Sequence, residues 1–133
     1  MKRKRYVIFL CVLSVASCAH VDTTAFRQCV DVGAVRGHPQ MYAGQVTNVC
    51  GVLADTFEDH NLYGSAKAAA QHSQTECLSV GTAAGFRGDL RAFAGRRVQL
   101  SGTVTAKFCP PGVLCTGSCS PIGIFVESVS EQD

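Results

Sequence analysis

The sequence predicts a mainly β domain of five strands, with one short helix between the third and fourth strands and with disulfide bonds as added support. Three observations predict it. Segments rich in β-branched residues alternate with turn formers, six cysteines lie in the part expected to fold, and 133 residues suffice for one domain but not two. With 47% hydrophobic and 17% charged residues, the composition is globular rather than disordered.

The start of the chain has the layout of an export signal. A basic cluster from Lys2 to Arg5 precedes an apolar run from Tyr6 to Ala16, and small residues follow it. As a helix this run would cover about 16 Å, roughly half of a hydrocarbon core of about 30 Å, so it is too short to span a membrane comfortably. We therefore expect residues 1–17 to be a signal peptide that the mature protein lacks.

The end of this signal resembles the bacterial lipobox. The residues from Val15 to Cys18 read Val-Ala-Ser-Cys, with Val where Leu is more usual. The resemblance implies that Cys18 is the lipid attachment site and the new N-terminus, and that residues 18–27 tether the domain to the membrane. Because Ala19 is not Asp, it also implies the inner leaflet of the outer membrane, facing the periplasm. The alternative is ordinary cleavage after Ala19, which would release a soluble secreted product.

Loss of the signal changes the charge balance of the chain. The full sequence carries 12 Lys and Arg against 10 Asp and Glu, and four of the basic residues lie in the signal. The remaining eight against 10 give a formal charge of −2. Composition then offers no argument for nucleic acid as a partner, and we expect none.

The cysteines indicate disulfides in an oxidising compartment. Cys11 lies in the signal and Cys18 is the lipid site, which leaves six thiols with fifteen possible connectivities. The six are Cys29, Cys50, Cys77, Cys109, Cys115 and Cys119. The alternative is zinc bound by the last three. Their CxxxxxCxxxC spacing lacks paired CxxC motifs and no His lies nearby in the sequence, so we expect no metal.

The stretch from Cys109 to Pro121 is rich in Pro, Gly and Ser, so it is neither a helix nor a central strand. A loop of this kind needs a cross-link. Since a short loop closes at low entropic cost, we expect Cys109 to pair locally with Cys115 or Cys119.

The first half of the domain begins with short elements. Residues 28–32 are expected to be extended, and residues 33–42 to form a helical turn that ends near Pro39. From Gln45 to Asp55 β-branched residues dominate, and Gly51 stands where a strand bends. This segment is the first main strand.

Residues 94–104 align without gaps on residues 43–53. Apolar and polar residues alternate more regularly here, so this is a half-buried strand. Two copies separated by different segments do not make a repeat architecture. The other expected elements are a strand at 61–65, a helix-prone run at 66–72, a strand at 76–80, a short helical pattern with Phe86, Leu90 and Phe93 on one face, and a final strand at 122–129.

This order is similar to that of an OB-fold, a five-stranded barrel with a helix between its third and fourth strands. Residues 38–46, 51–52, 61–65 and 77–78 also resemble small exported bacterial OB-fold proteins, in which Pro and Tyr precede a Gly and a Leu-Tyr pair begins the second strand. The resemblance covers residues 28–129. It implies a barrel and leaves function open, because OB-folds host unrelated activities.

The resemblance also places a binding surface on the second and third strands and on the loops after the first and fourth. Tyr63 lies there and would stack on a base or sugar, or pack against the barrel. Arg96 and Arg97 would engage a phosphate or an acidic partner, or simply lie on a solvated strand face. With His60, these residues form the candidate binding surface.

Residues Glu58, Asp59 and His60 place two carboxylates and an imidazole in one loop. These groups can perform acid–base chemistry, so one hypothesis is that the protein is a hydrolase that uses His60. Adjacent loop residues point in different directions, so we interpret the segment as an exposed polar loop. The sequence contains no GxGxxG, GxxxxGK[ST], GxSxG or HExxH motif, so we expect no cofactor and no catalytic residue.

We therefore expect a lipid-anchored binding module of the periplasm that catalyses nothing and binds another component of the cell envelope. The alternative is an immunity or inhibitor lipoprotein that neutralises a periplasmic toxin or lytic enzyme. A small, slightly acidic, tethered domain suits that task, since acidic surfaces attract basic enzymes.

Overall fold

The computed structural model describes residues 28–115, 119 and 121–133. The expected signal peptide, the lipid site Cys18 and the tether at residues 18–27 lie outside the described residues. The elements, in chain order, are β1 (Val30–Asp31), α1 (Val32–Gly37), α2 (Pro39–Tyr42), β2 (Val46–Asp55), β3 (His60–Tyr63), α3 (Ala66–Ala70), β4 (Cys77–Thr82), the 3-10 helix η1 (Leu90–Phe93), β5 (Arg97–Thr105) and β6 (Gly123–Glu131).

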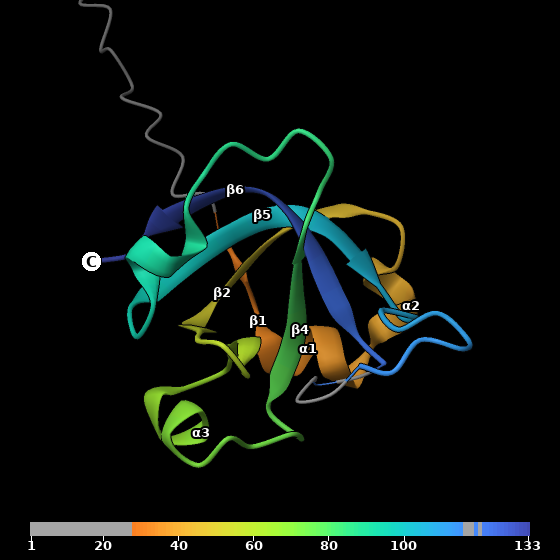
Figure 1. Ribbon diagram of the computed structural model, residues 1–133, viewed down its shortest axis with the longest axis horizontal. Coiled ribbons are helices and arrows are strands. Elements are labelled where there is room, and N and C mark those ends of the chain that lie inside the picture. The colour runs from red at the N-terminus through yellow and green to blue at the C-terminus, as the bar shows by residue number, and fades with distance from the viewer. Residues whose placement is uncertain (1–27, 116–118, 120) are drawn as a thin grey trace, which may run out of the picture.

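Five strands close into a barrel (Figure 1). The hydrogen-bonded order is β2-β3-β4-β6-β5, and β5 pairs back onto β2. The β4–β6 pair is parallel, whereas the other four barrel pairs are antiparallel. This is the topology of an OB-fold-like barrel, and it confirms the fold class predicted from the sequence. The extended piece predicted at residues 28–32 forms β1, which pairs in parallel with β2.

The two similar sequence segments become neighbours in the barrel. β2 and β5 pair antiparallel from Val46 opposite Thr103 to Val52 opposite Arg97. Each strand carries one glycine where another backbone comes too close for a side chain. A Cβ at Gly51 would collide with the carbonyl of Tyr63, and one at Gly102 would collide with the backbone of β6. These glycines let the strands curve tightly enough to close the barrel.

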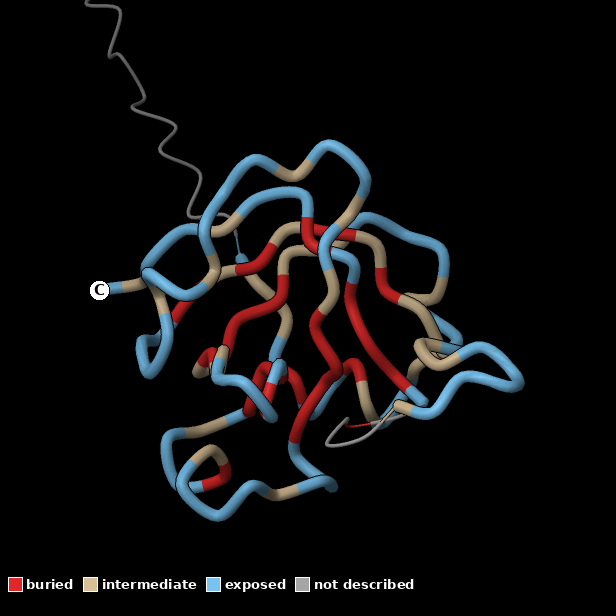
Figure 2. Tube along the Cα trace, in the orientation of Figure 1, coloured by how far each residue is buried: buried red, intermediate tan, exposed pale blue. Residues whose placement is uncertain are grey.

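Alternation along the strands builds the core (Figure 2). In β5, for example, Val98, Leu100, Gly102 and Val104 are buried, while Gln99, Ser101 and Thr103 between them are half-buried. Val32 and Val35 of α1 join the same apolar cluster, and α1 contacts β4. The inward faces of the strands therefore enclose one hydrophobic interior, closed in part by α1.

The helical segments differ from the prediction in their bounds. The helical turn expected at residues 33–42 is two helices, since Pro39 lacks an N–H and begins a new one at its first position. The helix expected to carry Phe86, Leu90 and Phe93 is only the four-residue η1. Asp89 caps it, with Oδ1 accepting a hydrogen bond from the Arg91 N–H at 3.0 Å, so Phe86 precedes the helix. All three side chains still pack against the core.

Three disulfides cross-link the domain: Cys29–Cys50, Cys77–Cys119 and Cys109–Cys115. The first attaches the segment before β1 to β2, with 5.5 Å between the Cα atoms. The second attaches the long loop after β5 to β4. The third is the expected local bridge, and it uses Cys115. The zinc alternative is wrong, because its three proposed ligands belong to two disulfides.

Candidate functional site

The structure places the four predicted surface residues in different settings. The Arg96 guanidinium donates to Glu131 at 2.8 Å, and both side chains are about half exposed, 54% and 48%. Arg97 is exposed at the start of β5. His60 is exposed at the start of β3, where its Nδ1 pairs with Oδ1 of Asp55. Arg96 is therefore engaged within the domain rather than available as a free cation.

The structure corrects the prediction that Tyr63 belongs to the binding surface. It is 2% exposed, so its ring offers no face on which a base or sugar could stack. Its hydroxyl donates to Oδ2 of Asp59 at 2.9 Å. Burial, together with this hydrogen bond, raises the pKa of the phenol above its ordinary value. Tyr63 thus remains a protonated donor and a packing residue.

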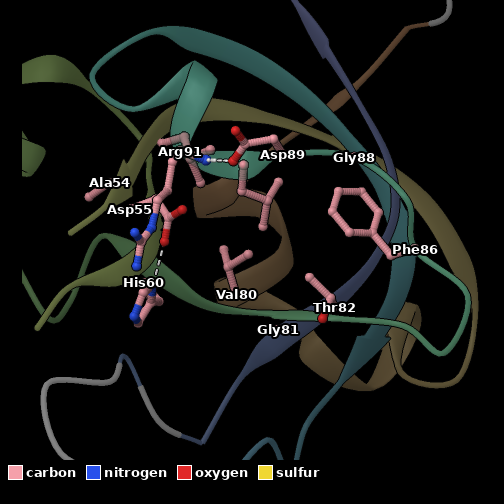
Figure 3. A pocket seen from close by; sticks show the side chains of 12 residues that line it. Ala54, Asp55, His60, Val80, Gly81, Thr82, Phe86, Gly88, Asp89 and Arg91 are labelled. Carbon is pink, nitrogen blue, oxygen red and sulfur yellow. Dashed lines mark hydrogen bonds and ion pairs between the residues drawn. The ribbon is translucent and has the colours of Figure 1, made fainter. Parts of the chain in front are cut away.

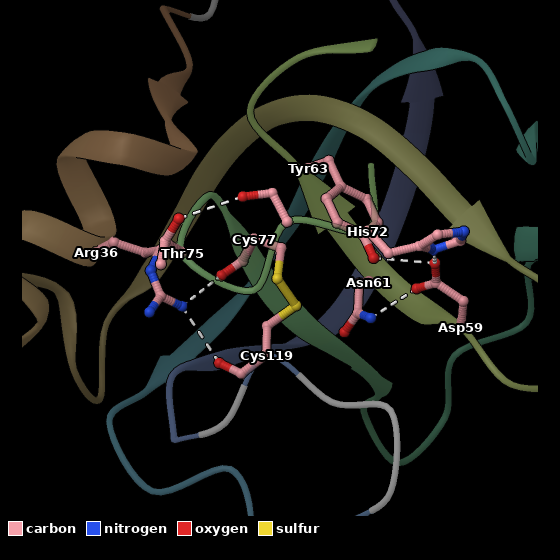
Figure 4. The surroundings of a disulfide bond; sticks show 9 residues. Arg36, Asp59, Asn61, Tyr63, His72, Thr75, Cys77 and Cys119 are labelled. Carbon is pink, nitrogen blue, oxygen red and sulfur yellow. Dashed lines mark hydrogen bonds and ion pairs between the residues drawn. A yellow bond between two sulfur atoms is a disulfide. The ribbon is translucent and has the colours of Figure 1, made fainter. Parts of the chain in front are cut away.

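The burial of Asp59 corrects the interpretation of residues 58–60 as an exposed polar loop. Glu58 is exposed as expected, but Asp59 is 8% exposed. Its carboxylate also accepts from Nδ2 of Asn61 at 2.6 Å and is 2.9 Å from Nδ1 of His72 (Figure 4). A buried carboxylate requires such partners. We refer to Asp59, Asn61, Tyr63 and His72 as the Asp59 cluster.

No sequence motif pointed to His72, but its backbone conformation explains how it reaches Asp59. His72 follows the last turn of α3 with φ at +47°, in the left-handed region where glycine usually ends a helix. Its side chain is 73% exposed while it contacts Asp59. The signal that could have found it is a histidine, rather than glycine, directly after a predicted helix.

The Cys77–Cys119 disulfide lies beside the Asp59 cluster (Figure 4). Both sulfurs are buried with Tyr63 and Ala68. Arg36 of α1 donates from Nη1 to the carbonyl of Cys77 at 2.7 Å and to that of Cys119 at 3.3 Å. The loop after β5 is therefore fixed over β3 and β4, on the face where OB-folds bind ligands, and a hollow of about 340 Å³ remains beside it.

A second hollow, of about 370 Å³, opens at one end of the barrel beneath η1 (Figure 3). We refer to it as the barrel-end pocket. Its floor includes the buried Leu53 and Val80, and its wall includes Phe86. Polar side chains from four segments, namely β2, β3, β4 and η1 with its cap, border it: Asp55, His60, Thr82, Asp89 and Arg91. Of the predicted surface residues, His60 alone belongs to this pocket.

The two histidines that border these hollows are each paired with a carboxylate. A general base acts on a nucleophile within hydrogen-bond reach, and in the described part of the chain the hydrogen-bond partners of the His60 and His72 side chains are Asp55 and Asp59. Among the described residues, no group of three His, Cys, Asp or Glu side chains is placed to hold a metal ion.

Comparison with known protein families finds no family model that matches the chain, and no curated protein matches it either. The fold and the two hollows define the class of protein: a disulfide-linked OB-fold-like barrel. Within the described ranges, no helix has the length and apolar character needed to cross a membrane.

Proposed function

We propose that this chain is an exported, lipid-anchored binding module of the bacterial cell envelope. The observation that carries the proposal is the pairing of six cysteines in three disulfides. Such cross-links form and persist in oxidising compartments such as the periplasm. Cys18 would anchor the chain to the inner leaflet of the outer membrane, and residues 18–27 would tether the domain. The module binds an envelope component and performs no chemistry.

Metabolic labelling tests the anchor. A labelled fatty acid is expected to enter the wild-type protein and to be absent from the Cys18→Ser variant. Cys11→Ser is the matched control, because Cys11 lies within the expected signal peptide and its replacement should leave labelling unchanged. Equal labelling of Cys18→Ser and the wild type would contradict the lipid anchor.

A second candidate function is inhibition of a periplasmic toxin or lytic enzyme, and the loop after β5 favours it. The Cys109–Cys115 disulfide closes a short loop, and the Cα atoms of these two cysteines lie 6.1 Å apart. Within this closed loop, Val113 is 57% exposed and Leu114 is 93% exposed. An apolar residue on a cross-linked loop loses little freedom on binding, so it suits insertion into the cleft of an enzyme.

Capture from envelope extract tests whether this loop binds a protein. Leu114→Ser is expected to lose a partner that the wild type retains. Phe57→Ser is the matched control, because Phe57 is 92% exposed on the loop between β2 and β3. Loss of a partner in Leu114→Ser alone, together with inhibition of that partner by the wild type, supports the inhibitor function. Identical capture by both variants contradicts a role for the loop.

A further inference from the structure

The barrel-end pocket exists because the connection between β4 and β5 is nearly all loop. In the described chain η1 is the only helix between these strands, and its four residues cover only part of the barrel end. β3 pairs with β4 only from Asn61 opposite Ser79 to Tyr63 opposite Cys77. The next residues of β4, from Val80 to Thr82, continue beside β6 alone and leave the wall open on the side of His60.

The pocket combines an apolar floor with a ring on its wall. Leu53 and Val80 are 1% and 7% exposed. The ring of Phe86 is half-buried and lies against Gly88, where a Cβ would come within 2.6 Å of it. At about 370 Å³ the pocket is at the small end of the usual range for ligand sites, which is about 300–1,000 Å³.

The polar groups at the rim carry charges of both signs. Two carboxylates, Asp55 and Asp89, share the rim with the guanidinium of Arg91 and the imidazole of His60, and Asp55 lies on the same side of the pocket as His60 and the Arg91 side chain (Figure 3). Asp55 is paired with His60, and Asp89 uses Oδ1 for the cap of η1. Within the described residues, the Arg91 side chain forms no ion pair or hydrogen bond. An anionic ligand would meet two carboxylates, and a cationic ligand would meet Arg91.

We infer that the barrel-end pocket binds a neutral saccharide. Hydroxyl groups both donate and accept hydrogen bonds, so they match a rim that offers carboxylates beside a guanidinium and an imidazole. The C–H face of a sugar ring matches Phe86 and the apolar floor. This inference rests on the proposed binding function but is independent of the lipid anchor and of Leu114, so failure of either experiment above leaves it intact.

The test is a titration of the mature, exported protein, followed by amide NMR. The neutral probes are glucose, N-acetylglucosamine and a soluble trisaccharide of N-acetylglucosamine, and the charged probes are glucuronate and glucosamine. A neutral probe is expected to shift the amides of residues 80–91. Tighter binding of the trisaccharide than of the single sugar would indicate a glycan chain, and equal binding would indicate a free sugar.

Arg91→Gln is expected to weaken binding by about tenfold or more, because hydrogen bonds from a charged group are the stronger kind. Arg87→Gln is the matched control, since Arg87 is exposed on the same connection but does not line the pocket. An unchanged thermal midpoint in both variants shows that folding is intact. The inference is overturned if no neutral probe shifts these amides, if a charged probe binds more tightly, or if both variants weaken binding equally.

Discussion

Removal of the Cys77–Cys119 disulfide should destabilise the domain more than removal of Cys109–Cys115. The first bridge joins residues 42 apart in the sequence and the second joins residues 6 apart. At 25 °C, chain entropy gives about 4 kcal/mol for the longer loop and about 2 kcal/mol for the shorter one. The bridge between Cys77 and Cys119 is also buried in an apolar cluster, so replacement of both residues by alanine leaves unfilled space and adds to the loss.

The assay is urea unfolding of two double variants, one with Cys77→Ala and Cys119→Ala and the other with Cys109→Ala and Cys115→Ala. Circular dichroism is the appropriate signal, because the chain contains no Trp. The first variant should also show a steeper dependence on urea, since its unfolded state is freed from the larger loop and exposes more surface. Equal losses of free energy in the two variants, or a wild-type midpoint in the first, would refute this reasoning.

Three further predictions concern single side chains. Tyr63→Phe should cost about 1.5–3 kcal/mol in urea unfolding, because it removes a hydrogen bond to a carboxylate. In the folded protein the pKa of Tyr63 is raised above its ordinary value of about 10. The hydrogen bond that the Tyr63 hydroxyl donates therefore stabilises the fold fully below about pH 10, and this stabilisation is lost as pH rises through the raised pKa, so Tyr63→Phe should lose less stability in alkali than the wild type. His72→Ala should be less stable than His72→Gly by about 1 kcal/mol, because φ is +47°, and the reverse order would contradict the backbone argument. Arg96→Ala should cost less than about 1 kcal/mol, since its ion pair with Glu131 is half exposed; a larger loss would show that the pair is structural.

The strands could be predicted because their signal is local. Alternation in residues 97–105 and the β-branched run in 46–55 specify half-buried strands without knowledge of the rest of the chain. The parity and location of the cysteines likewise indicated disulfides. Their partners were not predictable, because Cys77 meets Cys119 only after the loop that follows β5 has folded over β4.

The settings of the polar residues depend on contacts that sequence spacing does not encode. Asp59 is buried because Tyr63 and His72 reach it from β3 and from the end of α3. The barrel-end pocket depends on how little of the connection after β4 is helical, and spacing had suggested a longer helix that included Phe86. Both findings are consequences of tertiary structure acting on residues that look ordinary in the sequence.

The intact mass of the protein purified from bacterial membranes, alkylated under denaturing conditions before and after reduction, tests the central claim most directly. We expect a lipid-modified chain from Cys18 to Asp133 that takes up no alkyl group before reduction and six after it. A full-length chain from Met1 with all eight cysteines alkylated before reduction would contradict export, lipidation and disulfide formation together.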